Sequence, residues 1–209
     1  MRLCMFHPVG HPMERGWVGR IDGDRVLHLA AQTLQSFFTG GGTAREHAEY
    51  PLAETLLLAP VLHPPSIRIF DDQASFVFAN PAAVKGPSAV VHGPTRSLTV
   101  FPRVAAVMGA NGAIGGFTVL AEWRASGVTP PKDRDFAIGV GPVVVTPDEG
   151  RASFDGFDWA AAVQLAGLGT ALHPGDILAG PAAAPIDGEL GDVVTVEIEG
   201  IGALEQRLA

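Results

Sequence analysis

The chain is poor in charged residues, has a single cysteine and contains no cluster of basic side chains. Charged residues make up 17% of its 209 positions against 47% hydrophobic residues, which is typical of a folded core and excludes a disordered segment. A formal net charge of −8 without a basic cluster argues against nucleic acid as a partner, because phosphate binding needs a positive surface. The lone Cys4 permits no disulfide within the chain, which favours a cytoplasmic location.

Long apolar segments are also scarce. The N-terminal residues lack the extended apolar run of a signal peptide, so we expect none. The uncharged stretch over residues 104–121 approaches membrane-spanning length, but it holds four glycines and Asn111. Glycine clusters are turn signals, so this stretch predicts two buried strands around a glycine turn and no membrane partner.

The 26 glycines and 17 prolines are spread along the chain, as in a protein of many short strands. Apolar runs flank Asp22-Gly23, which predicts a hairpin over residues 17–29. Helices are expected at 30–38 and at 157–168, where Asp158 is a good N-cap. Further strands are predicted at 75–79, 97–107, 115–120, 136–145 and 193–198, the last with a strict period of two.

This order of elements predicts an α+β fold that is mostly β. The proline cluster of Pro60, Pro64 and Pro65 is the best candidate boundary in the chain. It divides the sequence into a small N-terminal domain, residues 1–60, and a core domain, residues 61–209.

Several short motifs also occur in a characteristic order along the chain. They are Phe78–Pro87, Val104–Gly109, Gly116–Val119, Lys132–Glu149, Pro174–Leu178 and Gly191–Gly202. Together with the opening hairpin, this ordered set covers most of the chain and resembles the fumarylacetoacetate hydrolase family. The resemblance implies a mixed β-sandwich or roll core with a small N-terminal β domain, commonly paired into dimers. In this comparison a hairpin of the family is shortened at 151–157, a change that either opens or closes the family's pocket.

The resemblance also implies a chemistry. The family holds a divalent ion, often magnesium, with an acid-x-acid pair on one strand and an aspartate on the next. A His-Glu pair on a lid activates water, and a lysine steadies developing negative charge. In this sequence Phe101 and Arg103 stand at the acid-x-acid positions and Glu122 at the aspartate, while Lys132 is retained.

Other positions depart from the family pattern as well. The lid region 69–76 has no histidine or glutamate, and a Gly-Thr pair has become Gly180-Pro181. The family arginine after the third ligand matches Ser126, with Arg124 two positions earlier. A phenyl ring and a guanidinium offer magnesium no lone pair, so we predict a degenerate metal site, no cofactor and no metal-dependent carbon–carbon hydrolysis.

Six residues are then the candidates for a metal-free site. The catalytic candidates are Arg103, Glu122 and Lys132, and the substrate-binding candidates are Phe101, Trp123 and Arg124. Arg103 either holds a substrate carboxylate with its planar fork or forms a buried ion pair with Glu122 that fills the vacant position. Lys132 is either a site residue or a surface lysine after two prolines.

The remaining reactive residue types give no competing site. Four histidines, His7, His11, His63 and His173, lie beside prolines in turn-like segments and do not converge as zinc ligands do. Cys4 has no nearby base in the sequence, so a buried inert thiol is expected. The glycines of 109–116 link two strands and do not precede a helix, unlike a dinucleotide-binding loop.

Three functions remain open. In the first, a metal-free pocket acts on a small oxo-acid or polyketide-like substrate by decarboxylation, isomerisation or cyclisation, and needs an open cavity. In the second, the chain is a non-catalytic partner for an intact relative in a hetero-oligomer. For the assembly, we expect a homodimer or such a hetero-oligomer. In the third, Asp71, Asp72, Asp133 or Asp135 supplies relocated metal ligands for hydrolysis.

Overall fold

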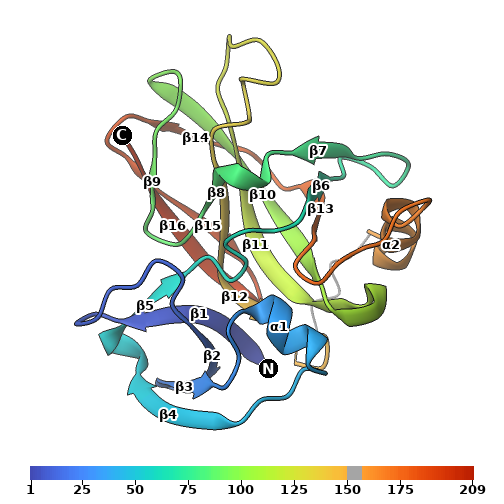
Figure 1. Cartoon of the computed structure of the whole chain (residues 1–209). Coiled ribbons are helices and arrows are strands. Elements are labelled where there is room, and N and C mark those ends of the chain that lie inside the picture. The colour runs from blue at the N-terminus through green and yellow to red at the C-terminus, as the bar shows by residue number, and fades with distance from the viewer. Residues whose placement is uncertain (150–156) are drawn as a thin grey trace.

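The structure, a computed structural model, describes residues 1–149 and 157–209. The segment 151–157, for which the sequence indicates a shortened hairpin, lies outside the described residues except for Phe157. The chain is mostly β, as expected, with few and short helices (Figure 1). Among the described residues, no helix is long and apolar enough to cross a membrane.

The strands form one large sheet and one small one. The large sheet has 13 strands: β1 (Arg2–Pro8), β2 (Trp17–Asp22), β3 (Arg25–Leu29), β4 (Glu46–Pro51), β5 (Thr55–Leu58), β6 (Ile67–Ile69), β7 (Val77–Ala79), β8 (Val84–Lys85), β10 (Ser97–Met108), β11 (Ile114–Arg124), β12 (Ile138–Val145), β13 (Ile177–Ala182) and β14 (Ile186–Glu189). The small sheet has the order β15 (Val193–Ile198), β16 (Gly202–Leu208) and β9 (Val90–Val91). The helices are α1 (Leu34–Thr39) and α2 (Trp159–Ala166), with single 3-10 turns at Leu52–Glu54, Pro81–Ala83 and Ala110–Gly112.

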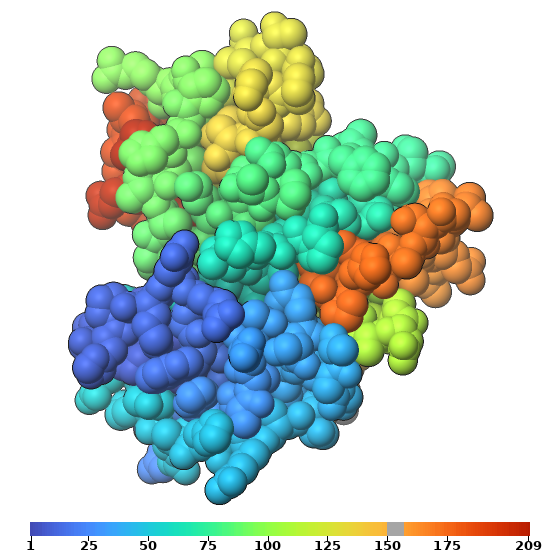
Figure 2. Space-filling view, viewed as in Figure 1, coloured from blue at the N-terminus to red at the C-terminus, as the bar shows by residue number. Residues whose placement is uncertain are grey.

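The N-terminal residues join the large sheet through their first strand. The hairpin predicted over 17–29 is confirmed: β2 pairs with β3 around Gly23, whose φ of +59° suits glycine in a tight turn. β1 pairs with β2 on one edge and with β12 on the other, so residues 1–60 share a sheet with the rest of the chain. In Figure 2 this N-terminal part packs directly against the segments that follow it.

The helix expected at 30–38 begins later, at Leu34. Thr33 is extended and accepts a hydrogen bond from the backbone N–H of Ser36, while the Ser36 side chain bonds back to the N–H of Thr33. This reciprocal capping box fixes the start of α1 and leaves residues 30–32 outside the helix. The second helix agrees with the sequence, because Asp158 caps α2 by accepting from the N–H of Ala161.

The central hairpin β10–β11 comes from the uncharged stretch of the sequence, and its prediction as two buried strands around a turn is confirmed. The strands are joined through Asn111 and Gly112, which have φ of +56° and +72°. One face of the large sheet packs on a core around Leu120, Ile138 and Val140. The other face packs against the small sheet through Trp123 and Leu204, so the central strands are apolar on both faces.

The single cysteine lies in this second core. Cys4 is fully buried, and burial raises the pKa of its thiol to about 12. A thiol that stays protonated at neutral pH is a poor nucleophile, which agrees with the expectation of an inert side chain.

Candidate functional site

The central hairpin presents four of the six candidate residues on one face of the large sheet. Phe101 on β10 lies opposite Glu122 on β11 in the strand register. Arg103 and Arg124 lie two residues further along β10 and β11, respectively, and side chains two apart share a face. The sheet therefore brings Phe101, Arg103, Glu122 and Arg124 together.

Arg103 is buried, with 1% of its side chain exposed, and its guanidinium is fully hydrogen-bonded. Its Nε donates to Glu122 Oε2 at 2.8 Å, and its Nη1 donates to the carbonyl oxygens of Phe70 at 3.1 Å and Gly180 at 2.9 Å. Its Nη2 lies 2.6 Å from Asp71 Oδ1 and 2.8 Å from Glu122 Oε2. The five N–H groups thus face four acceptor atoms, with Glu122 Oε2 shared by Nε and Nη2, which leaves no N–H for a substrate.

Glu122 is equally well partnered. Its side chain is 1% exposed, and Arg103 contacts one carboxylate oxygen while Arg124 Nε donates to the other at 2.7 Å. A carboxylate held between two guanidinium groups is a poor proton acceptor, because protonation would remove both ion pairs. The arrangement therefore supports the ion-pair interpretation of Arg103 and Glu122 over a catalytic role for either residue.

Arg124 lies at the outer edge of this network. Its guanidinium carbon lies 4.3 Å from the centre of the Phe101 ring, a cation–π contact, and its side chain is 24% exposed. Its two Nη atoms make no hydrogen bond within residues 1–149 and 157–209. Of Arg103 and Arg124 on the central hairpin, Arg124 is therefore the one with donors free within the described residues, and the Phe101 ring lies against its guanidinium.

The loop after β11 adds a third arginine. Arg134 donates from Nη2 to Asp133 at 2.8 Å, and this hydrogen bond raises the pKa of Arg134, with smaller contributions from Glu122 and Asp71. Arg103 donates to Asp71 and lowers the pKa of that carboxyl group, with further contributions from Arg124 and Arg134. These mutual effects place Asp71 and Arg134 in the same charged cluster.

Aromatic side chains close the inner side of the cluster. A Cβ on Gly180 would lie 3.2 Å from the ring of Trp159 and 3.4 Å from that of Phe157, so α2 and the residues before it cover the backbone that binds Arg103. Phe70, whose carbonyl oxygen also accepts from Arg103, packs edge-on against Phe157 at a centroid distance of 5.7 Å. Access to the cluster is therefore from the side of Asp71, whose side chain is 66% exposed.

The structure does not bring Trp123 into this cluster. Trp123 lies opposite Val100 in the register and so points to the other face of the sheet, where its Nε1 donates to Gln206 at 2.7 Å. A Cβ on Gly139 would clash with Gln206 Oε1, so Gln206 packs closely against the backbone of β12. This placement corrects the pairing of Trp123 with Phe101 as walls of one pocket.

Lys132 is likewise turned to solvent. Its side chain is 76% exposed and its Nζ contacts Asp135 at 2.7 Å, so the structure gives it the surface ion pair that the sequence offered as an alternative. No contact with Arg103 or Glu122 is found for it within the described residues.

The residues at the cluster do not fit a magnesium site. Glu122 is one carboxylate, both of its oxygens are taken by guanidinium groups, and Arg103 places a fixed positive charge where a cation would have to approach. Across residues 1–149 and 157–209, no three His, Cys, Asp or Glu side chains gather as a metal-binding group. Each carboxylate considered as a relocated metal ligand already accepts a hydrogen bond. Asp71, Asp133 and Asp135 accept from Arg103, Arg134 and Lys132, respectively. Asp72 accepts from the backbone N–H of Ala74.

Sequence reasoning did not assign Asp71 and Arg134 to a metal-free site. Asp71 was considered as a relocated ligand, and its charge offered the only signal. Arg134 is ten residues beyond Arg124, in the loop between β11 and β12. No local sequence pattern predicts that this loop folds back towards the sheet.

The fold defines the class of the protein: it is a fumarylacetoacetate hydrolase-like fold. Maleylpyruvate hydrolase from Sphingobium sp. SYK-6 has 21% identity and a TM-score of 0.78, covering 100% of this chain and 99% of that chain. A 2-keto-3-deoxy-D-arabinonate dehydratase complexed with magnesium and 2,5-dioxopentanoate has 16% identity and a TM-score of 0.79, covering 100% of this chain and 98% of that one. A 2-hydroxyhepta-2,4-diene-1,7-dioate isomerase from Mycobacterium marinum has 23% identity and a TM-score of 0.76, again covering 100% and 98%.

These three structures are of a hydrolase, a dehydratase and an isomerase, and they share their fold with this chain. No protein-family model matches the sequence, and no curated protein matches it either. Identities in this range establish a shared fold, so the activity of this chain is argued from its own residues.

The charge of Asp71 gives a pH-dependent prediction. Arg103 lowers the pKa of Asp71 in the folded protein, so the pair stabilises the fold above the unfolded pKa of about 3.9 and ceases to do so as the pH falls through the lower folded value. Because Asp71 is largely exposed, we expect Asp71→Asn to cost only about 0.5 kcal/mol at pH 7. Denaturant unfolding should show a smaller difference at pH 2.5 than at pH 7, because part of the contribution is lost once the pH falls below the unfolded pKa.

Asp22→Asn is a suitable control, since Asp22 is an exposed carboxylate in the hairpin. A difference for Asp71→Asn that persists unchanged at pH 2.5 would show that the pair with Arg103 is not its source.

Proposed function

We propose that the protein acts on a small oxo-acid without a divalent ion and binds the carboxylate of that acid at Arg124. One observation carries the proposal: Arg103 and Glu122 use all their hydrogen-bonding groups within the cluster, whereas both Nη atoms of Arg124 remain free within the described part of the chain. A guanidinium with two free parallel donors suits a carboxylate. The Phe101 ring packs against the Arg124 guanidinium and so limits the orientations in which it can bind the carboxylate.

The cluster favours reactions that need charge stabilisation and no activated water. Decarboxylation of a β-oxo-acid breaks the bond to the carboxyl carbon, releases CO2 and leaves the electron pair on an enolate, which a nearby guanidinium stabilises and water then protonates. This reaction needs no base, whereas double-bond isomerisation must first remove a proton. Arg124 and Arg134 supply that positive charge at the open side, while no carboxylate of the cluster is free to act as a strong base. Metal-dependent carbon–carbon hydrolysis receives no support from these residues.

The test is a calorimetric titration of the protein with pyruvate in the presence of EDTA. We expect saturable binding that Arg124→Gln weakens by about tenfold, the usual scale for one charge-assisted carboxylate contact. Arg96→Gln is the matched control, because Arg96 is an exposed arginine in the loop between β9 and β10. Equal binding by wild type and Arg124→Gln would place the carboxylate elsewhere, and binding that requires added magnesium would contradict the metal-free proposal.

A second candidate function is that of a non-catalytic partner subunit, in a homodimer or with an intact relative. The observation that favours it is the edge strand β7, where the side chains of Val77 and Phe78 are 49% and 67% exposed. Exposed apolar side chains on an edge strand, one side of which has no partner strand, are typical of an interface between subunits. Light scattering of wild type and Phe78→Ser separates the cases, since a monomer in both would remove this candidate.

A further inference from the structure

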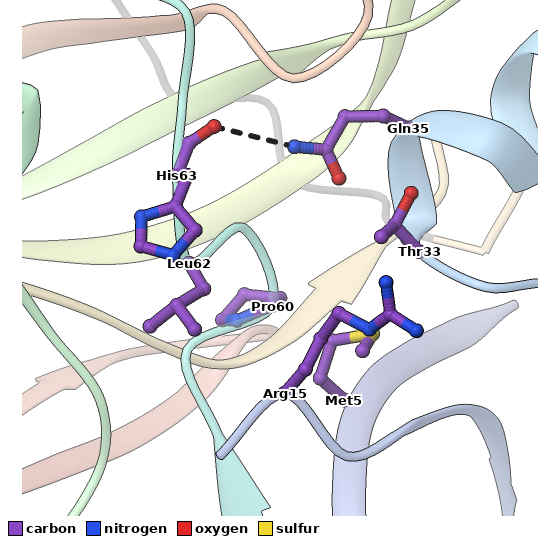
Figure 3. Close-up of a pocket in the computed structure, with 7 residues that line it drawn as sticks. All are labelled: Met5, Arg15, Thr33, Gln35, Pro60, Leu62 and His63. Carbon is purple, nitrogen blue, oxygen red and sulfur yellow. Dashed lines mark hydrogen bonds between the residues drawn. The ribbon is translucent and has the colours of Figure 1, made fainter.

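A cavity lies away from the arginine cluster, beside the N-terminal residues. It has a volume of about 320 Å³ and is lined by Met5, Arg15, Thr33, Gln35, Pro60, Leu62 and His63 (Figure 3). Its walls come from β1, the loop before β2, the start of α1 and the segment that follows β5. The volume is within the range of sites that hold small molecules.

One side of this cavity is apolar. Met5 is 3% exposed, Pro60 is buried and Leu62 is half-buried, so these three side chains form a floor that does not depend on mobile surface groups. An apolar group placed on this floor gains the free energy of removing its surface from water.

The opposite rim carries a cation without a partner. Arg15 is exposed and makes no hydrogen bond or ion pair with residues 1–149 or 157–209, and no Asp or Glu is among the residues that line the cavity. In a chain of net charge −8, an unpaired arginine at the edge of an apolar cavity is a local positive site. Figure 3 shows its guanidinium beside Thr33, with Gln35 and His63 across the open space.

The polar rim is held in place by packing. Gln35 Nε2 donates to the carbonyl oxygen of His63 at 3.5 Å, which bridges α1 and the segment before β6. A Cβ on Gly175 would lie 2.5 Å from Gln35 Cγ, so the backbone of Gly175 supports the same side chain from behind. A ligand in the cavity therefore meets residues from the N-terminal part and from the core together.

From this geometry we infer that the cavity is a second ligand site for a small monocarboxylate with a compact apolar body, such as a short-chain or aromatic acid. Arg15 binds the carboxylate, and Met5, Pro60 and Leu62 contact the apolar part. The site is independent of Arg124 and of the oxo-acid chemistry proposed there.

The experiment is a titration of hexanoate into protein labelled with ¹³C at the methionine methyl groups. The Met5 methyl lines the cavity, and Met5→Leu assigns its signal. We expect a saturable shift of this signal, weakened by about tenfold in Arg15→Gln and unchanged in Arg96→Gln and Arg124→Gln. Hexan-1-ol, which lacks the charge, should produce a much weaker response.

Any one of four outcomes would overturn the inference. A Met5 signal that does not move with hexanoate would show that the cavity holds no such ligand. If hexanoate shifted the Met5 signal equally in Arg15→Gln and in wild type, Arg15 would not be the group that binds the carboxylate. The same would follow if hexan-1-ol shifted the wild-type signal as much as hexanoate does. Loss of the Met5 response in Arg124→Gln, with the response retained in Arg15→Gln, would place the acid in the arginine cluster. Failure of pyruvate to bind at Arg124 would contradict the proposed function and would not change the Met5 result.

Discussion

Glu122→Gln is expected to lower the free energy of unfolding by about 3–5 kcal/mol, because it leaves Arg103 buried with most of its charge uncompensated. Glu122 contacts Arg103 through one carboxylate oxygen and Arg124 through the other. A neutral glutamine amide does not compensate the positive charge of either guanidinium. Asp71 remains as a partner of Arg103, but it is largely exposed and contributes less. In a chain of this size the loss corresponds to a fall in Tm of roughly 6–20 °C.

The measurement is denaturant unfolding at pH 7, with circular dichroism as the readout. Glu199→Gln is the matched control, because Glu199 is exposed and the same chemical change there should alter stability by less than about 0.5 kcal/mol. If Glu122→Gln lowers the free energy of unfolding by no more than the control does, the buried ion pair contributes little to the stability of the fold.

The second large effect is expected from Arg103→Met. This change removes the cation that Glu122 faces and leaves the carbonyl oxygens of Phe70 and Gly180 without donors, which together cost about 3–5 kcal/mol. The double variant Arg103→Met with Glu122→Leu removes both charges at once. We expect it to be about as stable as either single variant, so that the two losses are far from additive.

The exposed pair Arg25–Glu49 provides a parallel cycle, since its side chains are 62% and 56% exposed. Arg25→Met with Glu49→Leu should show a coupling below about 1 kcal/mol. If the coupling between Arg103 and Glu122 is no greater than in this surface pair, the two residues do not stabilise the fold as a unit.

Much of the fold was predictable because its signals are local. The alternation of residues 193–198, the Asp22-Gly23 turn and the Asp158 cap each depend on a few neighbouring residues. The start of α1 was missed because a capping box at Thr33 outweighs the apolar run before it. The division at residue 60 stays a prediction, although β1 and β12 share hydrogen bonds across it.

The site was predictable only in part. Positions 101, 103, 122 and 124 meet because two paired strands align them, and the period of two would also have placed Trp123 on the opposite face. The contacts of Arg103 with Asp71 and Gly180 span 32 and 77 residues of sequence. No pattern within the sequence indicates that Phe157 and Trp159 would close the inner side.

We propose that the buried ion network of Arg103, Glu122 and Arg124 occupies the positions at which the fumarylacetoacetate hydrolase family would hold a metal. The most direct measurement is a calorimetric titration with Mn²⁺ and Mg²⁺, performed on wild type and on Glu122→Gln under conditions where both are folded. The account predicts no saturable binding at millimolar ion for either protein, because both oxygens of Glu122 are engaged by arginines. Saturable binding by wild type that is abolished in Glu122→Gln would contradict it.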